Sequence, residues 1–373
     1  MLHEVEEIDA AGGRVQVRDL KSGVSEWESY DQLLIATGAV PLCPHLPGSD
    51  AVDICGINTL ESGLELRRRL DSGAIKKGVV VGGGYIGLEM AEAMVKHGLE
   101  VSLVDRSAQV MGTLDDDMGA LVSQALRDFG VTVHLEESLA EFQTAAGKVT
   151  GIVTDKRTLP ADIVILGLGV VPNTALAVAA GIPLGEKGAI RVNERMETGI
   201  AGIWAAGDCA ESFHLVSRKP FYIALGTVAN RHGRVAGINL GGGYATFPGV
   251  VGTAITRICN VEVARTGLQE KELRELGIEW VSAVIKSRTK AGYFPGAGEI
   301  TVKVLAERGS GRLLGGQIVG MEGSAKRIDT LATALHAGFT VEEMINLDLG
   351  YAPPFSPVWD PVVTAAREAA KKL

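Results

Sequence analysis

The sequence predicts an α/β fold that continues into a C-terminal α+β module. Residues Val79–Asp105, "VVVGGGYIGLEMAEAMVKHGLEVSLVD", read as a strand, a glycine-rich turn, an amphipathic helix and a second strand. The 48 glycines lie mainly at strand-to-helix junctions, which is typical of α/β proteins. From Phe247 onward the pattern changes to longer alternating strands, and this predicts an α+β module on a separate core.

The glycine-rich turn predicts a dinucleotide site. Gly82, Gly84 and Gly87 occupy the glycine positions of G-x-G-x-x-G, and Asp105 ends the next strand, where such folds bind an adenosine ribose. Glycine is needed at the first position for a tight turn, at the second for approach to a pyrophosphate, and at the third for helix packing. The phosphates would then meet free N–H groups at the positive end of a helix dipole.

Composition sets the broad class. A chain of 373 residues with 46% hydrophobic and 22% charged residues is globular and long enough for two or three domains. A net charge of −9 disfavours nucleic acid as a partner. The N-terminus has no signal-peptide pattern, and the longest apolar stretch, 163–171, is too short to cross a bilayer. We therefore expect a cytoplasmic chain with no membrane partner.

No metal site is predicted. The four cysteines, Cys43, Cys55, Cys209 and Cys259, show neither C-x-x-C spacing nor a metal-binding pattern with the histidines. The acids Asp115 to Asp117 suit the positive start of a helix, whereas consecutive carboxylates on a helix do not converge on a metal.

The remaining pattern predicts further elements. The first 35 residues read as short antiparallel strands that lead into a buried strand ending at Thr37-Gly38. Helices are expected at 59–72 and 224–240, and strands near 131–135, 148–153 and 161–166 complete a parallel sheet with a small meander.

Three motifs resemble one family in its order, the flavin-dependent pyridine nucleotide-disulfide oxidoreductases. The segment "YDQLLIATGAVP" is similar to the crossing between flavin and nicotinamide domains, "VVVGGGYIGLEMAE" to the NAD(H) motif, and "IWAAGDCAE" to the second flavin motif. The resemblance covers nearly the whole chain. It implies two Rossmann-like nucleotide-binding domains, the first incomplete, and a C-terminal α+β dimerisation domain, hence a homodimer. The expected boundaries are a partial FAD-binding domain at 1–55, the NAD(H)-binding domain at 56–172, a return segment of the FAD-binding domain at 173–245, and the dimerisation domain at 246–373.

The resemblance also implies the cofactors and their ligands. Asp208 would accept a hydrogen bond from a ribitol hydroxyl, and Thr227 would start a helix that faces the flavin pyrimidine edge. Tyr85 would form an aromatic lid over the flavin, with core packing as the alternative. Glu89 would pair with a lysine that the sequence does not identify. The cofactor-binding residues that the resemblance implies are Ala36, Thr37, Gly38, Gly82, Gly84, Tyr85, Ile86, Gly87, Glu89, Asp105, Gly169, Gly207, Asp208 and Thr227.

Asp105 favours NADH over NADPH. A carboxylate accepts a hydrogen bond from a free 2′-hydroxyl and repels a 2′-phosphate. Arg106 adjoins it and works against this preference.

The C-terminal segment "LDLGYAPPFSPVWDPVVTAARE" resembles the coenzyme A-disulfide reductase, NADH oxidase and persulfide reductase branch. In the coenzyme A-disulfide reductases, two tyrosines reach from one subunit toward the redox centre of the other, and Tyr293 and Tyr351 fit both contexts. A phenol can hydrogen-bond a thiolate or donate a proton to a leaving thiol. Lys326 and Arg327 offer positive charge for the phosphates of coenzyme A. Lys286, Arg288 and Lys290 could do the same, with an ordinary solvated surface as the alternative interpretation of these three residues.

The resembling family has an N-terminal FAD motif and a redox-cysteine helix before the point where this chain begins. We therefore expect that at least one βαβ unit of roughly 30 residues is missing through a truncated reading frame, a split or designed chain, or a misassigned start codon. None of the four cysteines matches the redox position, and each is interpreted as a buried or incidental thiol.

Two classes of function remain open. The first is an oxidoreductase that passes electrons from NADH through FAD to a small-molecule disulfide, persulfide or peroxide, with coenzyme A disulfide or a persulfide favoured and NADH oxidase or peroxidase activity as the alternative. The second is a catalytically incomplete NAD-binding and dimerisation module.

Overall fold

A computed structural model describes residues 2–373, and the chain divides into two compact units. Unit 1 contains residues up to Val40 and then Val170–Val250, whereas unit 2 contains Pro41–Gly169 and Val251–Leu373. Each unit is therefore built from two separate stretches of the chain.

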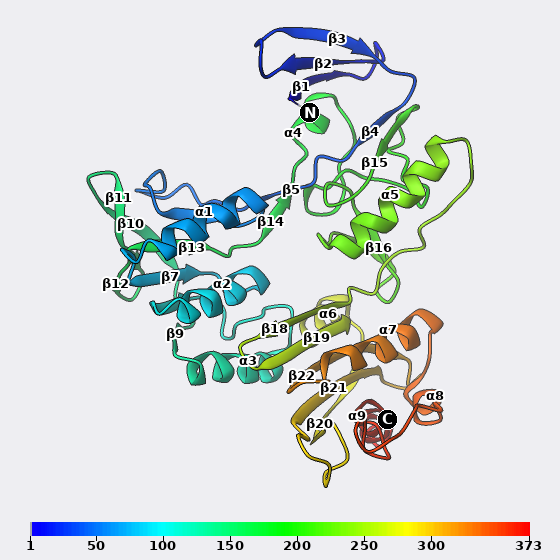
Figure 1. The fold of residues 1–373 in the computed structure, drawn as a ribbon. Helices are drawn as coiled ribbons and strands as arrows, with labels where there is room; N and C mark the ends of the chain where they lie inside the picture. Colours follow the sequence, from blue (N-terminus) through cyan, green and yellow to red (C-terminus); the bar gives the residue numbers. More distant parts are fainter. Residues whose placement is uncertain (1) are drawn as a thin grey trace. The chain divides into compact units, whose positions relative to one another are not determined.

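Unit 1 begins with the antiparallel strands that the alternating pattern predicts (Figure 1). Strands β1 (His3–Asp9), β2 (Arg14–Asp19) and β3 (Ser25–Ser29) form one sheet. Strand β4 (Leu33–Ile35) pairs in parallel with β15 (Ile203–Ala205), a strand from a distant part of the chain. The other elements of unit 1 and its border are β5 (Ala39–Pro41), β14 (Val170–Pro172), β16 (Ser212–His214), β17 (Lys219–Phe221), α4 (Ala175–Ala179), η1 (Glu186–Gly188) and α5 (Gly226–Leu240).

Strand β4 differs from its prediction. It ends at Ile35, two residues before Thr37, and only Ile35 is buried while Leu34 is exposed. The sequence predicts a buried strand here, but in this unit the strand pairs with β15 and buries one side chain.

The first part of unit 2 is a five-stranded parallel sheet in the order β6-β13-β7-β8-β9. This confirms the predicted parallel sheet. Its strands are β6 (Ile54–Gly56), β7 (Lys77–Val81), β8 (Glu100–Val104), β9 (Val131–His134) and β13 (Ile163–Leu166), with helices α1 (Leu60–Asp71), α2 (Tyr85–Lys96) and α3 (Asp116–Asp128). The predicted meander is the antiparallel sheet of β10 (Leu139–Ala145), β11 (Lys148–Thr154) and β12 (Thr158–Pro160).

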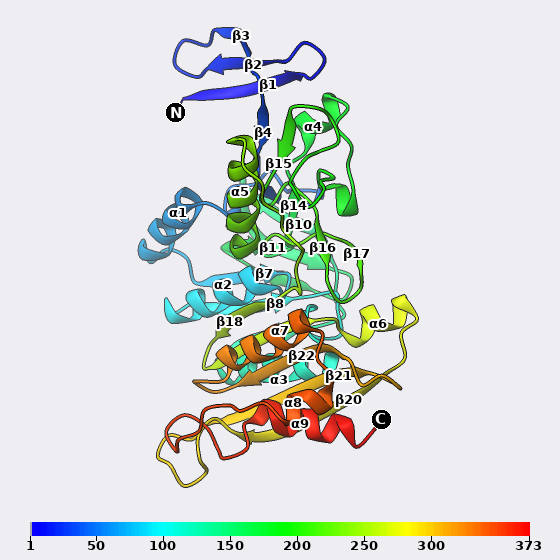
Figure 2. The same ribbon diagram turned by 90° about the vertical axis from the view of Figure 1, so that its right-hand side faces the viewer.

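The second part of unit 2 is an antiparallel sheet in the order β18-β19-β22-β21-β20 (Figure 2). Helix α7 packs against β19 and β22, whereas α9 packs against β20 and β21. The strands are β18 (Ala254–Ile258), β19 (Val261–Gly267), β20 (Trp280–Arg288), β21 (Glu299–Glu307) and β22 (Leu313–Gly320), and the helices are α6 (Glu270–Leu276), η2 (Ala325–Arg327), α7 (Ile328–Ala337), α8 (Val341–Ile345) and α9 (Pro361–Ala370). The predicted α+β module is thus present.

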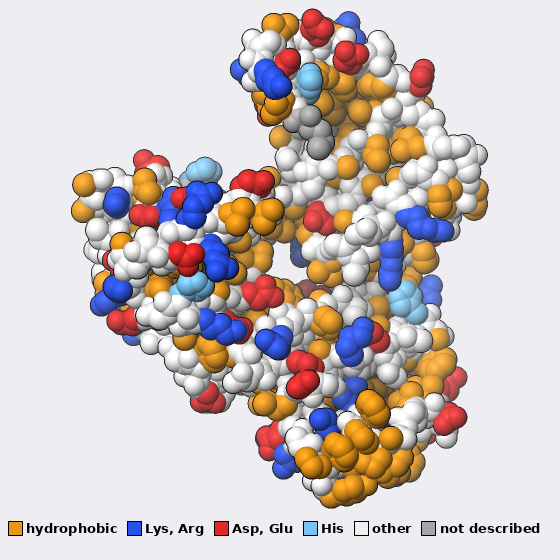
Figure 3. Space-filling model, viewed as in Figure 1, with side chains coloured by type: hydrophobic (Ala, Val, Ile, Leu, Met, Phe, Trp, Pro, Cys, Tyr) orange, Lys and Arg blue, Asp and Glu red, His pale blue; other side chains and the backbone are white. Residues whose placement is uncertain are grey.

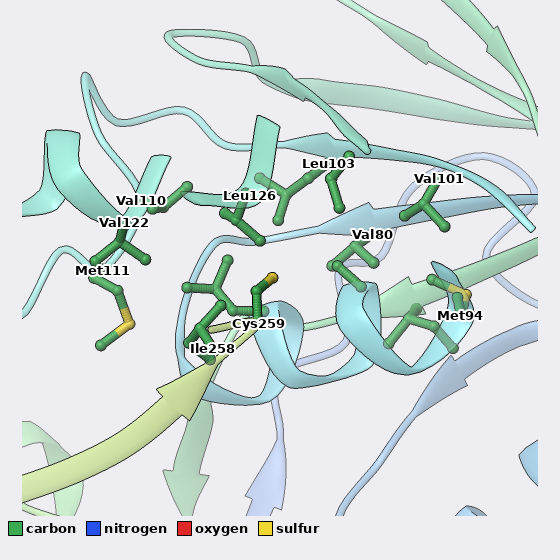
Figure 4. Close-up of a cluster of buried hydrophobic side chains, with 14 of the residues drawn as sticks. Val80, Met94, Val101, Leu103, Val110, Met111, Val122, Leu126, Ile258 and Cys259 are labelled. Carbon is green, nitrogen blue, oxygen red and sulfur yellow. The ribbon is translucent and has the colours of Figure 1, made fainter. Parts of the chain in front are cut away.

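The two parts of unit 2 share a hydrophobic core, and in this respect the expectation of a separate core is wrong. Val80 and Leu103 from the parallel sheet and Leu126 from α3 lie in one buried cluster with Ile258 and Cys259 from the C-terminal sheet (Figure 4). Alternation along a strand predicts that one face is buried, but it does not identify the element that covers that face.

The glycine-rich turn is packed backbone against backbone. A Cβ added at Gly87 would lie 2.0 Å from the carbonyl oxygen of Gly82, and one added at Gly82 would lie 2.5 Å from that of Gly167. Gly82 also has a φ of +103°, which other residues rarely adopt. By contrast, the nearest atom to a Cβ at Gly84 is 3.8 Å away, and its φ is −82°.

These contacts separate a structural glycine from a binding glycine. We expect Gly87→Ala to lower the free energy of unfolding by about 2 kcal/mol or more, because the new methyl group meets backbone that cannot move aside. We expect Gly84→Ala to change stability by about 0.5 kcal/mol or less but to weaken NADH binding, since its methyl group would stand where a pyrophosphate approaches. Denaturant unfolding and NADH titration of both variants measure this, and equal destabilisation by the two would contradict it.

Candidate nucleotide and redox sites

In unit 2, the end of β7 and the start of α2 form an open anion site. Gly84 is the N-cap residue of α2, and no side chain caps the helix. The first turn of a helix has N–H groups without intrahelical partners, and an uncapped terminus leaves them for a ligand. The site therefore has the donors that the prediction for Gly82, Gly84, Ile86 and Gly87 requires.

Asp105 is part of the turn itself. Its carboxylate accepts hydrogen bonds from the backbone N–H of Gly83 at 2.6 Å and from that of Ser107 at 2.7 Å. The carbonyl of Gly83 in turn accepts from the N–H of Met111 at 2.8 Å. A carboxylate has further lone pairs, so a ribose hydroxyl can still donate to it. Asp105 thus fixes the turn and holds a negative charge at the end of β8.

Tyr85 and Glu89 have partners within unit 2. The Tyr85 ring packs partly against the shared core, and its hydroxyl accepts a 3.4 Å hydrogen bond from Thr113. These contacts fit the core-packing alternative, and the flavin lid stays a prediction. The hydroxyl of Thr256 donates to Glu89 at 2.7 Å, and no lysine pairs with Glu89 among residues 2–373.

Gly167 is a residue of this site that the sequence analysis missed. It follows β13, and a Cβ there would lie 2.7 Å from the Cα of Gly87. The predicted Gly169 lies two residues further on, is exposed, and has a φ of +90°. The sequence signal that could have identified Gly167 is the repeated glycine in "LGLG", because Gly167 is the first of these two glycines.

In unit 1, two motifs far apart in the sequence meet at one sheet edge. Parallel pairing of β4 with β15 brings Ala36–Gly38 beside Gly207-Asp208, because the carboxyl ends of parallel strands lie on the same side. Gly38 and Gly207 have φ values of +71° and +82°. The Thr37 hydroxyl donates to the carbonyl of Asn173 at 2.5 Å, so this residue fixes the loop.

Asp208 carries the strongest sign of a ligand in unit 1. Its Oδ1 atom is buried without a hydrogen-bond partner, and burial raises the pKa of the carboxyl group. The Tyr222 hydroxyl is likewise buried without a partner, and burial together with the charge of Asp208 raises its pKa to about 12. A buried polar atom left unpaired costs about 1 to 3 kcal/mol, which a polyhydroxyl ligand with donors and acceptors would recover. Tyr222 was missed, since an isolated tyrosine carries no motif.

Thr227 lies in the first turn of α5 and is exposed. The N-cap residue is Leu225, so no side chain caps this helix either. The residues of unit 1 predicted to bind FAD thus combine an acceptor, an open backbone turn and an uncapped helix start, a set that fits a flavin nucleotide.

His232 of α5 is fully buried, and its Nε2 atom lies 3.1 Å from the Ser212 hydroxyl. Burial lowers the pKa of its imidazole to about 4. The unfolded chain binds this proton near pH 6.5, so the stabilisation is complete above pH 6.5 and is lost as the pH falls toward 4.

We therefore expect the free energy of unfolding to fall by roughly 3 kcal/mol between pH 6.5 and pH 4 because of this group. His232→Gln removes that part of the pH dependence, whereas His45→Gln, at an exposed histidine, keeps it. Denaturant unfolding at a series of pH values measures both, and an unchanged slope in His232→Gln would refute the assignment.

The two predicted tyrosines lie together in the C-terminal part of unit 2. The Tyr293 side chain beside Tyr351 raises the pKa of the Tyr351 phenol. Both side chains are open to solvent, with exposed fractions of 46% and 78%. The phenol pair can therefore reach a molecule outside this chain's own core.

The basic residues predicted for coenzyme A differ in their availability. Lys326, Lys286 and Arg288 are exposed, and Lys290 is half-buried with its ammonium over the Phe294 ring. Arg327 is only 12% exposed, and its guanidinium is bonded to Asp360 and to backbone carbonyls. The prediction of Arg327 as a phosphate ligand is therefore not supported by its contacts.

The remaining predictions concern thiols, metals and membranes. Cys209 and Cys259 are buried, Cys55 is half-buried and Cys43 is exposed, and burial raises the pKa of Cys55 and that of Cys259, the latter to about 11. Within residues 2–373, no group of three or more metal-binding side chains comes together. Nor does that part of the chain contain a helix long and apolar enough to cross a membrane.

The fold and these sites define a protein that binds two nucleotides and carries an α+β C-terminal part. The chain belongs to the pyridine nucleotide-disulphide oxidoreductase family, whose model matches residues 1–233 and whose dimerisation-domain model matches residues 253–362. The expected α/β fold class and the expected family are thereby confirmed.

Three relatives place the chain within this family. It is 37% identical to a CoA-dependent NAD(P)H sulfur oxidoreductase of Pyrococcus furiosus over 98% of this chain and 81% of that protein. It is 36% identical to an NADH oxidase of Methanocaldococcus jannaschii over 98% of this chain and 81% of the relative. Among solved structures, it is similar to an NAD-dependent persulfide reductase from A. fulgidus, with 39% identity, a TM-score of 0.95, and coverage of 99% of this chain and 69% of that one.

Proposed function

We propose that the protein transfers electrons from NADH through FAD to a disulfide, with coenzyme A disulfide or a persulfide as the substrate. The observation that carries this proposal is the pair of unpartnered buried groups at Asp208 and Tyr222 beside an open backbone turn. Family membership and the named activities of the sulfur oxidoreductase and persulfide reductase relatives support it.

The chain's own residues would act mainly by holding the nucleotides. In unit 2, Gly84 and the start of α2 receive the NADH pyrophosphate, and Asp105 accepts from the adenosine ribose. In unit 1, Asp208 accepts from a ribitol hydroxyl and the uncapped start of α5 faces the flavin. Bound at these residues, FAD would supply the two-electron redox chemistry between NADH and the sulfur substrate.

The tyrosine pair would donate hydrogen bonds or protons to the sulfur atoms of the substrate. Cleavage of a disulfide by two electrons yields two thiolates, which take up two protons to become thiols. A phenol whose pKa is raised stays protonated at neutral pH, so Tyr351 can donate a hydrogen bond or a proton to the leaving thiolate. The exposed Lys326, Lys286 and Arg288 would then attract the phosphates of coenzyme A.

We also propose a homodimer that uses the C-terminal part of unit 2. Hydrophobic side chains gather over α9 and the β20–β21 loop (Figure 3). Large apolar side chains exposed there are Tyr293, Tyr351, Phe355, Val358 and Trp359. Such a contiguous patch is typical of an interface between proteins, and the match to a dimerisation-domain model agrees with this.

NADH oxidase or peroxidase activity is the second candidate, and the M. jannaschii relative favours it. The two candidates differ in the final acceptor. Stopped-flow reduction of the flavin by NADH, followed by turnover with coenzyme A disulfide, oxygen or hydrogen peroxide, separates them. A chain that binds NADH but shows neither flavin absorbance nor turnover would instead support the NAD-binding and dimerisation module.

Asp105 should determine both affinity and preference for NADH. Asp105→Ala removes an acceptor for the ribose and two bonds to the turn, so we expect NADH affinity to fall on the order of tenfold or more. Asp105→Asn keeps a hydrogen-bond acceptor for the ribose but removes the negative charge. The difference between the affinities for NADH and NADPH should therefore become smaller. Titration of both variants with both nucleotides tests this, and an unchanged preference in Asp105→Asn would exclude the charge argument.

Tyr351→Phe should slow disulfide turnover while it leaves flavin reduction by NADH within about twofold. A positioned general acid contributes on the order of a hundredfold or more, so a loss of at least tenfold is expected. Tyr244→Phe, at an exposed tyrosine of unit 1, is the control. The two half-reactions are followed by flavin absorbance, and an equal loss in both would contradict the assigned role.

A further inference from the structure

We propose that Arg327 is the positioning residue for the Tyr293–Tyr351 pair; its catalytic consequence rests on the proposed disulfide reduction. Arg327 precedes α7, and its side chain is 12% exposed. Its guanidinium bonds to four groups, which lie in three segments of the C-terminal part of unit 2. Two of these segments carry the tyrosines.

The first two contacts join the tyrosine loops. The Nη2 group donates to the carbonyl of Thr289 at 2.8 Å and to the carbonyl of Phe355 at 2.7 Å. Thr289 begins the β20–β21 loop, which carries Tyr293, and Phe355 lies four residues after Tyr351. One nitrogen atom thus bridges the two loops.

The loops also contact each other directly. The N–H of Ala291 donates to the carbonyl of Pro353 at 3.0 Å, which joins the loop of Tyr293 to the loop of Tyr351. Thr289 and Ala291 are buried, whereas both tyrosines are exposed. Because the exposed rings have few packing contacts, their separation depends on the backbone beneath them. Arg327 holds that backbone.

The other contacts orient the guanidinium. Its Nε group donates to Asp360 at 3.0 Å, and Nη1 donates to the carbonyl of Gly323. Asp360 is itself fixed, since its carboxylate caps α9 through the N–H of Val362 at 2.9 Å and accepts from the Ser356 hydroxyl at 3.1 Å. The arginine is therefore held against the start of a helix, and its remaining donors point at fixed positions.

This geometry requires arginine. A guanidinium has five N–H donors in one rigid plane, which matches a carboxylate and three carbonyls around it. A lysine ammonium could keep the pair with Asp360, but its three donors on a flexible stem cannot bond to all four groups at once. From the sequence, Arg327 is predicted to offer positive charge to phosphates, whereas its contacts in the structure hold the two loops together.

The kinetic test compares Arg327→Lys, Arg327→Gln and the control Arg312→Gln, whose arginine pairs with Glu307 at the surface. We expect Arg327→Gln to lower disulfide turnover on the order of tenfold, with flavin reduction by NADH within about twofold and kcat reduced more than KM is raised. Arg327→Lys should recover only part of the loss. Full activity in Arg327→Lys would overturn the proposal, because it would show that charge alone suffices.

The double variant Arg327→Gln/Tyr351→Phe tests whether Arg327 acts through the tyrosine. If it does, the second substitution adds little to the loss caused by Tyr351→Phe alone, since coupled residues are not additive. Losses that multiply would show that Arg327 acts independently, and the proposal would fail. Coenzyme A disulfide is the probe in each case.

Two measurements do not depend on turnover. Hydrogen exchange at the Ala291 N–H should accelerate in Arg327→Gln, because the two loops separate. Ultraviolet difference titration should show one phenol that ionises at lower pH than in the parent chain, since the neighbouring Tyr293 raises the pKa of Tyr351. If the exchange rate and the phenol titration both change but the parent chain has no disulfide reductase activity, the proposed function fails and the positioning role of Arg327 stands. If neither measurement changes, the positioning role fails.

Discussion

The close contact among the backbones at Gly82, Gly87 and Gly167 is the constraint on which unit 2 depends. It sets the depth at which α2 lies on the parallel sheet, because no side chain separates helix from strand. From that position, the Glu92 carboxylate of α2 accepts the N–H of Cys259 at 2.8 Å, and Glu89 accepts the Thr256 hydroxyl. The nucleotide turn and the C-terminal sheet are therefore located by the same helix.

A buried ammonium provides the second link between the two parts of unit 2. Lys303 of β21 is 3% exposed and lies within 3.0 Å of carboxylate oxygens of Asp115, Asp117 and Glu270. Burial acts to lower its pKa, but the three carboxylates outweigh burial, so its pKa is raised and the charge persists. Loss of Lys303 would leave the buried Asp115 carboxylate without a cation, which makes this cluster specific to one arrangement.

The candidate sites use two kinds of support. At Asp208 and Tyr222, buried polar atoms remain unpaired, so the protein retains a cost that a bound nucleotide would offset. At Tyr293 and Tyr351 the phenol groups are exposed, and Arg327 bonds to the backbone of the two loops that carry them. A ligand would complete the first proposed site, whereas the chain itself would position the second.

The sequence by itself determined the parallel sheet, the C-terminal α+β part and the family, because glycine spacing and hydrophobic periodicity are local properties. It also found the acids at the start of α3, but as helix-start residues only. Tertiary structure decided their pairing with Lys303, the shared core around Cys259, the contact of Gly167 and the burial of Tyr222. The tertiary structure also shows that Arg327, which was expected to offer charge at the surface, bonds to the backbone of two loops. Each of these features joins residues that are far apart in the sequence. A periodic pattern is local, so it does not predict which distant group a side chain or a carbonyl will contact.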